Sequence, residues 1–553
     1  MQEQNQPATM DKFSPYLLIV LMTLIAWTPF GHDITPIGEM WFMQSQVESL
    51  QGIISSWSIQ ADRIFWFWSV LLGHWLTPET FQGQQIVFMG VYILRGTLTY
   101  LILHKLFPKL KAWALTVSVL SLFCPSDPDG FWLGALHVHA HDALFLLPVY
   151  MFLQIWEQPK VWKWILLFFF QNIVLWSYEG TLLLNMTVPM LSLYLENSWK
   201  PSKYALKNWL FWYISPMLSI FIRLVMFFNA SRTHFVRKID RSFDFIGILD
   251  GLAKAFYTLF IGWTEKISLV FQTDVFLAYT VGVFLLYAGY LLLNEFNFKE
   301  ETNQDTKNIG ARIFIGLALI LLGFFPYALT DLLRYRYDRT LILPWLGATI
   351  VFTTGIWEIS KKTNKKGYLA FLISSFFLAS TISFSMHHRQ VQISDTNYQN
   401  QALIKILSTI PKLQKNTAVL LICEDCPDTR AFYAFSVDAF FDGAIRFIYR
   451  DNTLRGFTYH YSNAEDKYYK PTGIQGRLDQ FPLNRLIIIR YLAEKQEVKI
   501  EKKIPTEIIS ADNPTLHEYA PALRYESNSL LPYRACLLFR GFFTLPNTCA
   551  VAP

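Results

Sequence analysis

FSPYLLIVLMTLIAWTPFGHDITPIGE, residues 13–39, begins with an apolar run and ends in a polar segment that contains His32, Asp33 and Glu39. The apolar run, 13–30, is close to the length that crosses the hydrocarbon core of a bilayer. Ionisable side chains at the edge of a membrane are costly to desolvate and usually serve chemistry or transport. The stretch therefore predicts a membrane-spanning helix followed by a candidate site at the membrane surface.

The composition of the whole chain is that of a membrane protein. Of 553 residues, 52% are hydrophobic, 17% are aromatic and only 16% are charged, against about 25% charged in a typical soluble domain. The mean hydropathy is +0.26. The net charge of +6 is informative only through the distribution of Lys and Arg between loops. Apart from this mild excess nothing indicates nucleic-acid binding, and no nucleic-acid partner is predicted.

Apolar segments of near bilayer length recur along the chain, and we predict about eleven spans. The third is too short to cross a bilayer without tilting or extension. The segment 62–76 is apolar but short and carries His74, so it predicts a helix that lies in the membrane interface. The predicted spans are 13–30, 84–104, 112–124, 139–156, 161–178, 180–195, 207–228, 274–293, 312–332, 340–357 and 368–386.

Lysine-rich short loops predict the orientation, because such loops face the cytoplasm. They lie at 104–111, 159–163, 200–207, 294–312 and 361–366. Together with the spans, they predict a multi-pass protein of the cell membrane with a cytoplasmic N-terminus. The acidic loops 31–83 and 125–138, and everything after about 386, then lie on the extracytoplasmic side.

The last part of the chain is less apolar and predicts a second domain. Short apolar runs at 417–422, 444–449 and 485–489 are typical of strands, and 397–413 is typical of a helix. We therefore predict an α-helical membrane domain over 1–386 and a soluble extracytoplasmic α/β domain over 387–553.

Four of the five cysteines lie in this second domain. Cys423 and Cys426 form a CxxC pattern, with Cys536 and Cys549 further along. Zinc binding and thioredoxin-like redox chemistry both use such a pattern. An oxidising exterior favours structural disulfides, whereas Cys124, at the end of a span, is expected to be an ordinary small apolar residue.

Asp33 and Glu39 are the candidate catalytic carboxylates of the first loop. A carboxylate there can act as a general base towards an acceptor hydroxyl, and partial burial would raise its pKa towards that task. The alternative is that these acids only cap or solvate the loop.

The second acidic loop and the span after it hold the densest group of polar residues. Histidines at i and i+4 share a helical face, so His137 and His141 would lie together while His139 points elsewhere. No cofactor is assigned. A divalent metal on His137 and His141 with Asp142 or Asp129 is one alternative, and hydrogen bonding to a sugar or phosphate is another. Glu179, between two spans on the same side, either faces this cavity or marks a tight turn. The candidate substrate-binding residues are Asp127, Asp129, His137, His139 and Glu179.

Two basic segments, 231–241 and 331–339, fall on the extracytoplasmic side against the positive-inside tendency. Arginine presents a planar fork to phosphoryl oxygens, so Arg334, Arg336 and Arg339 are candidate phosphate ligands. The alternatives are contact with lipid headgroups and pairing with neighbouring acids, which are Asp240, Asp244, Asp331 and Asp338.

This arrangement resembles the GT-C superfamily of integral membrane glycosyltransferases, which includes protein O-mannosyltransferases and aminoarabinose lipid A transferases. Asp33 lies where that family has its acidic catalytic residue after the first span, and Asp127 and Asp129 occupy the family's second acidic loop. The 62–76 segment matches an interfacial helix. The late arginines match a loop that meets the phosphate of a polyprenyl-phosphate-linked sugar. The family often has adjacent acids in the first loop, whereas here Glu39 follows Asp33 at a distance, so the identity of the base stays open.

The resemblance implies an inverting glycosyltransferase that moves a sugar from a polyprenyl-phosphate-linked donor to an extracytoplasmic glycan, lipid or protein. Its partners would be the lipid-linked donor, the acceptor and the bilayer. The aromatic segment around Trp66 and Trp68 would bind the lipid chain. The alternatives are a transporter or flippase of a charged solute or lipid, and a non-catalytic component of polysaccharide assembly. A transporter commonly has repeated halves and ionisable residues in mid-membrane. Here the acids lie at one face and no repeat is visible, which favours the enzyme.

Overall fold

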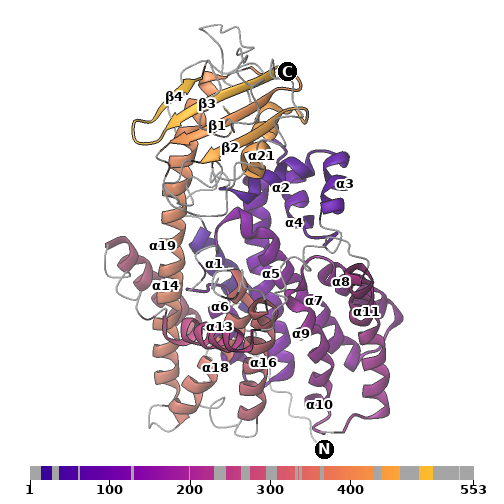
Figure 1. Ribbon diagram of the computed structural model, residues 1–553. Coiled ribbons are helices and arrows are strands. Elements are labelled where there is room, and N and C mark those ends of the chain that lie inside the picture. Colours follow the sequence, from indigo (N-terminus) through magenta and orange to yellow (C-terminus); the bar gives the residue numbers. More distant parts are fainter. Residues whose placement is uncertain are drawn as a thin grey trace, which may run out of the picture.

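Apolar helices form most of the structure, and a small sheet follows them near the end of the chain (Figure 1). The computed structural model describes residues 14–27, 37–59, 63–125, 127, 130–198, 200–228, 244–262, 264, 274–293, 308–329, 334, 339–361, 366–410, 412–424, 426, 435, 438–460, 485–501, 535 and 538.

The helical part of the chain divides at about residue 200. Its first half contains α1 (Pro15–Trp27), α2 (Glu39–Val47), α3 (Leu50–Ile59), α4 (Trp68–Leu76), α5 (Gln82–Leu106), α6 (Lys111–Leu120), η2 (Leu133–Ala135), α7 (Leu136–Glu157), α8 (Val161–Leu175), η3 (Glu179–Thr181), α9 (Leu182–Thr187), η4 (Val188–Met190) and α10 (Leu191–Leu195). Its second half contains α11 (Lys203–Phe228), α13 (Phe245–Tyr257), η5 (Thr258–Gly262), α14 (Asp274–Leu293), α16 (Ile309–Ala328), η7 (Arg339–Leu341), α18 (Ile342–Lys361) and α19 (Lys366–Thr409).

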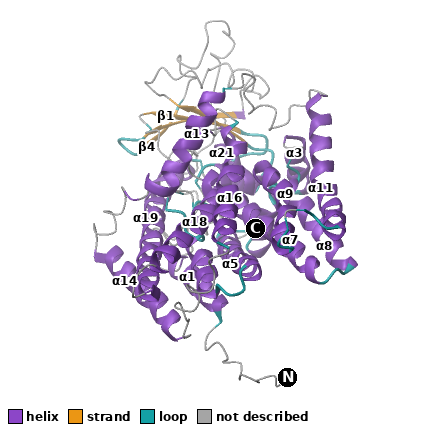
Figure 2. Ribbon diagram, turned by 90° about the horizontal axis from the view of Figure 1, so that it is seen from below, coloured by secondary structure: helices purple, strands orange, loops and turns teal. Residues whose placement is uncertain are grey.

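Six of the described helices are long and apolar enough to cross a membrane, which makes the chain a multi-pass membrane protein. They cover Gln82–Leu106, Leu133–Glu157, Lys203–Met226, Phe245–Gly262, Ile309–Ala328 and Ile342–Ser360. In both views α14 and α11 lie at opposite edges of the bundle (Figures 1 and 2).

Each segment predicted as a span overlaps a helix, and the predicted interfacial segment contains α4. The number of crossings and their orientation stay predictions. Phe245–Gly262 is not among the predicted spans, which pass from 207–228 to 274–293. In the structure this segment forms α13 and η5 and is apolar enough to be a candidate span. In Figure 1 α13 lies crosswise to α19. Asp244 caps the N-terminus of α13 by accepting a hydrogen bond from Gly247 N at 2.9 Å.

Small residues allow two helices of the bundle to approach closely. Gly316 of α16 faces Gly347 of α18, and a Cβ built on Gly316 would lie 2.8 Å from the Gly347 carbonyl oxygen. Close contacts of this kind drive helix association in lipid, where burial of apolar surface gives little gain. Trp27 of α1 is fully buried and packs edge-on against Phe88 and Phe131.

The helix α19 connects the bundle to the sheet (Figure 1). It has 44 residues and is therefore about 66 Å long, roughly twice the thickness of a hydrocarbon core. The predicted span 368–386 and the first part of the predicted helix 397–413, up to Thr409, belong to this one helix. It passes the predicted domain boundary at 386 without a break.

The sheet has the strand order β2-β1-β3-β4. Its strands are β1 (Ala418–Glu424), β2 (Arg455–His460), β3 (Leu486–Leu492) and β4 (Glu497–Ile500). The central strand β1 pairs in parallel with β2, with Ala418 opposite Arg455, and in parallel with β3, with Ala418 opposite Leu486. The last strand, β4, is antiparallel to β3. The buried apolar runs of β1 and β3 are typical of strands covered on both faces.

One predicted strand is wrong, because 444–449 belongs to the helix α21 (Asp438–Tyr449). The residues Phe441, Ala444, Ile445 and Ile448 are all buried, and their spacing is that of one helical face. A short window covers too few turns to separate this period from that of a strand.

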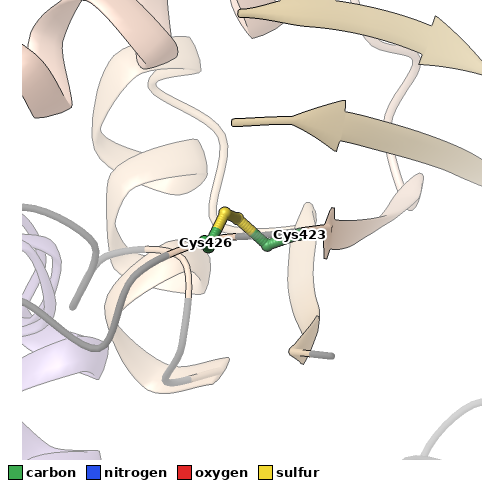
Figure 3. The surroundings of a disulfide bond; sticks show 2 residues. All are labelled: Cys423 and Cys426. Atoms are coloured by element: carbon green, nitrogen blue, oxygen red, sulfur yellow. A yellow bond between two sulfur atoms is a disulfide. The ribbon is translucent and has the colours of Figure 1, made fainter. Parts of the chain in front are cut away.

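The CxxC motif lies at the carboxyl end of β1, where Cys423 and Cys426 form a disulfide (Figure 3). The predicted disulfide chemistry is confirmed for this pair. Cys124 is buried, as predicted. Cys536 and Cys549 lie outside the described residues.

Candidate active site

The first turns of α7 carry three buried histidines on two faces of the helix. His139 lies on one face, and His137 and His141 lie on the other, as the i, i+4 spacing predicts. The two faces meet different partners, so they are described in turn.

The face of His139 is a buried charged network. His139 Nε2 lies 3.3 Å from Asp127 Oδ2, and His139 Nδ1 lies 3.3 Å from Arg95 Nη1. Arginine can only donate hydrogen bonds, so this network assigns an acceptor Nδ1 to the imidazole and places its proton on Nε2, towards the carboxylate. All three side chains are at least nine-tenths buried.

Two residues of α5 hold the segment that presents Asp127. Tyr92 donates its hydroxyl proton to the Gly130 carbonyl, and Arg95 donates through Nη2 to the Leu122 carbonyl. The Tyr92 ring also stacks on the His139 imidazole, with 5.4 Å between ring centroids. The segment before α7 is therefore fixed to α5 at both of its ends.

Arg389 of α19 brings a second buried guanidinium to this region. Its Cζ lies 4.6 Å from the ring centroid of Trp27 and 5.1 Å from that of Phe131, which is within cation–π range. His388, beside it, has Nε2 3.4 Å from the Pro125 carbonyl oxygen. The long helix that leads to the sheet thus contacts the second acidic segment directly.

The opposite face of α7 is mainly aromatic. The Tyr178 ring lies 6.3 Å from His137 and 5.6 Å from His141, and Trp66 lies 5.7 Å from His137. His141 Nε2 is 3.1 Å from the Thr181 hydroxyl. His141 Nε2 also lies 4.0 Å from Asp142 Oδ1. Among the residues that the structure describes, no group of three or more His, Cys, Asp or Glu is placed to hold a metal ion.

In the first acidic loop, the described residues begin at Ile37. Gly38 has a φ of 64°, a left-handed conformation that favours glycine, and it leads directly into α2, whose first residue is Glu39. Trp132 Nε1 donates to the Ile37 carbonyl at 2.8 Å. This bond ties the start of α2 to the second acidic segment. Asp33 lies outside the described residues.

Arg334 pairs with an acid, as one alternative of the sequence analysis predicts. Its Nη1 is 2.7 Å from Asp244 Oδ2, and its Nε donates to the Ala328 carbonyl at 3.0 Å. Arg334 thereby fastens the end of α16 to the capped start of α13. Asp129 and Arg336 lie outside the described residues, and only the backbone is described for Glu179 and Arg339, in η3 and η7.

The sequence analysis missed Arg95 and Arg389. Arg95 had a readable signal, because an arginine inside an apolar span normally faces a polar partner or a functional site. Arg389 lies just beyond the last predicted span, where an arginine is ordinary, and only the packing of α19 against Trp27 and Phe131 makes it part of the site.

Two cavities adjoin this network. A narrow one is lined by polar residues that include Arg95, Asp127 and His139, together with Ile342 of α18. A larger one, of about 670 Å³, is mostly apolar and lies between α5, α7, α16 and α18, with α9 and α10 beside it. Its size is that of a small-molecule site.

No family model and no curated protein matches this chain. Solved structures that are similar include ArnT from Cupriavidus metallidurans bound to undecaprenyl phosphate, at 10% identity and a TM-score of 0.36, covering 78% of this chain and 87% of that one. The apo state of the same protein is similar at 11% identity and a TM-score of 0.34, covering 86% and 92% of the two chains.

Proposed function

We propose that this protein is a membrane glycosyltransferase that transfers a sugar from a polyprenyl-phosphate-linked donor to an extracytoplasmic acceptor. One observation carries the proposal: the narrow polar cavity and the large apolar cavity are one helical turn apart on the same two helices. Arg95 lines the first and Thr99 the second along α5, and Ile342 and Leu346 do so along α18. Residues four apart share a helical face, so both helices lead from the polar region into the apolar one.

An amphiphile with an anionic head and a long apolar tail matches the polarity of this pair of cavities. The apolar cavity surrounds the tail with apolar side chains. The polar cavity offers cationic and hydrogen-bonding groups to the head. A lipid phosphate has this chemistry. Arg95 lines the polar cavity, and the buried Arg389 packs against Phe131, which also lines it. Electrostatic stabilisation of a leaving phosphate is often the largest catalytic contribution.

The reaction that we propose is a single displacement. A carboxylate of the first loop, Asp33 or Glu39, takes the proton of an acceptor hydroxyl while the oxygen attacks the anomeric carbon of the sugar. The bond between that carbon and the phosphate oxygen breaks, and the polyprenyl phosphate leaves with the electron pair, so the anomeric configuration inverts. Asp127, Asp129, His137, His139 and Glu179 position sugar and acceptor. Because Arg334 already pairs with Asp244, we propose that Arg336 and Arg339 add phosphate contacts to those of Arg95 and Arg389, with Arg334 positioning their segment.

The test is turnover of labelled polyprenyl-phosphate sugars by the purified protein with a pool of glycan, lipid and protein acceptors. Transfer supports the enzyme. Flux of lipid or solute across proteoliposomes without transfer would instead identify a transporter or flippase. Asp33→Asn and Glu39→Gln, compared with wild type at equal expression and membrane insertion, identify the base as the substitution that abolishes transfer. Full transfer by both variants would exclude a first-loop base.

A cavity-filling pair tests the lipid site itself. Ala318 of α16 lines the apolar cavity, and its neighbour Leu317 is 36% exposed on the outer side of the same helix. We expect Ala318→Trp to abolish the thermal stabilisation that undecaprenyl phosphate gives the wild-type protein, because ligand binding stabilises in proportion to occupancy. Leu317→Trp should keep it. Equal loss in both variants would contradict this site.

A further inference from the structure

Besides α19, the described helix α21 joins the sheet-bearing part of the chain to the bundle by packing on α2. At the centre of this contact is Gly443. A Cβ built on it would lie 2.6 Å from the Trp41 carbonyl carbon and from the Phe42 nitrogen, so the two helix backbones touch. Only glycine permits so close an approach. Figure 1 shows α21 between the sheet and α2.

Aromatic packing and a polar rim surround this contact. Phe447 of α21 lies 6.0 Å from the Trp41 ring and 5.1 Å from Phe81, at the start of α5. Trp41 is fully buried. Further along, Arg450 forms an ion pair with Glu79. The contact therefore joins α21 to α2 and to the start of α5 at once.

α21 is in turn fixed to the sheet. Asp442 accepts a hydrogen bond from Gly456 N of β2 at 2.8 Å and pairs with Arg446 at 2.5 Å. Burial raises the pKa of Asp442, and the Arg446 guanidinium opposes that rise. A shift of the sheet would accordingly carry α21 with it.

α2 transmits this contact towards the candidate site. Its first residue is Glu39, and the residue two before that, Ile37, accepts the Trp132 indole hydrogen bond from the second acidic segment. At its other side, Gln44 Nε2 is 2.8 Å from His74 Nδ1, and Gln44 Oε1 accepts from Gln84 Nε2 at 2.7 Å. α2 is thus held between α21, α4, α5 and the segment that carries Asp127.

We infer that the sheet-bearing part of the chain is a positioning element for the transfer reaction: by seating Gly443 on α2, α21 sets the place of Glu39, the first residue of α2, relative to Asp127. This inference rests on the proposed function. It assigns a role to residues that touch no substrate, and it makes Gly443, Phe447 and Arg450 positioning residues.

The test compares Gly443→Ala with Gly90→Ala in the full-length protein. A Cβ at Gly90 of α5 meets nothing within 4 Å, so both variants gain the same methyl group and the same helix propensity, but only the first disturbs α2. Amide exchange of 39–47 reports the position of α2 without reference to activity. Transfer kinetics report the effect on the reaction.

We expect Gly443→Ala to raise exchange over 39–47 and to lower kcat about tenfold or more, since small misplacements of reacting groups are costly, with KM for the lipid donor within about twofold. Gly90→Ala should change neither. Unchanged exchange in Gly443→Ala, or raised exchange with unchanged kcat, would overturn the inference. Absence of transfer by the wild type is a different result, because it removes the proposed function while exchange still reports the docking.

A surface charge pair covers the case in which Gly443→Ala does not fold. Arg450 and Glu79 are both more than one-third exposed, so Arg450→Glu should fold and lower kcat only about twofold, as expected for an exposed pair. The double variant Glu79→Arg with Arg450→Glu restores the attraction and should restore kcat. Recovery would show that the charge pair itself, and not a side effect of either substitution, acts on kcat. Its absence together with normal exchange over 39–47 would contradict the positioning role.

Discussion

The two faces of α7 differ in chemistry although the same residue type occupies both. His139 lies between a carboxylate and a guanidinium, each 3.3 Å away. His137 and His141 lie against aromatic rings and the Thr181 hydroxyl. The comparison teaches that histidine spacing decides which rings lie together, whereas the elements packed on each face decide whether they are part of a charged network or of an aromatic wall. Four substitutions test this difference.

The largest effect is expected for Asp127→Asn. The substitution leaves Arg95 and His139 buried without their carboxylate, and breaking a buried charged arrangement costs about 3 kcal/mol or more. The unfolding transition in detergent should fall accordingly. The control is Glu157→Gln at the other end of α7, where the carboxylate is 57% exposed and the loss should be below about 1 kcal/mol. Equal shifts in the two variants would contradict the buried network.

His139→Leu should cost about 2 kcal/mol, because Arg95 loses a buried hydrogen-bonding partner and Asp127 loses a buried polar contact. His139→Gln keeps a side chain that can both donate and accept, so it should recover part of that loss. Thermal unfolding of the two variants in parallel measures the difference. If leucine and glutamine were equally destabilising, the imidazole would not be bridging the two charged groups.

His141→Phe should cost about 1 kcal/mol, the usual value of one neutral hydrogen bond, since the contact with Tyr178 is retained by the phenyl ring. A double-mutant cycle with Thr181→Val isolates the pair. We expect the double variant to be no less stable than His141→Phe alone. Fully additive losses would show that the Thr181 contact contributes nothing to stability.

The smallest effect on stability is expected for His137→Phe, within about 0.5 kcal/mol, because an aromatic ring can keep the contacts with Trp66 and Tyr178. Transfer should nevertheless fall, since His137 is a proposed substrate-positioning residue. Loss of stability as large as that of His139→Leu would remove the distinction between the two faces. Normal transfer would remove His137 from the proposed site.

Hydrophobic pattern and spacing determined a large part of this structure. Each predicted apolar segment overlaps a helix. The length and apolar content of a segment are local properties of the sequence, and they decide whether it can span a bilayer. The shared face of His137 and His141 follows from helix geometry alone. The apolar runs at 417–422 and 485–489 also correctly predicted the strands β1 and β3. Asp33, Asp129 and Arg336 lie outside the described residues, so their proposed roles stay predictions.

Tertiary structure decided which segments distant in sequence pack together, which these local patterns do not specify. The run 444–449 is part of a helix because its apolar residues bury one face against α2 and the sheet. Arg95 and Arg389 join the site because α5 and α19 pack beside Asp127 and Trp27, and Gly443 matters only because α2 lies against it. Partners distant in sequence are selected by packing, and a local pattern carries no information about which helix will lie opposite.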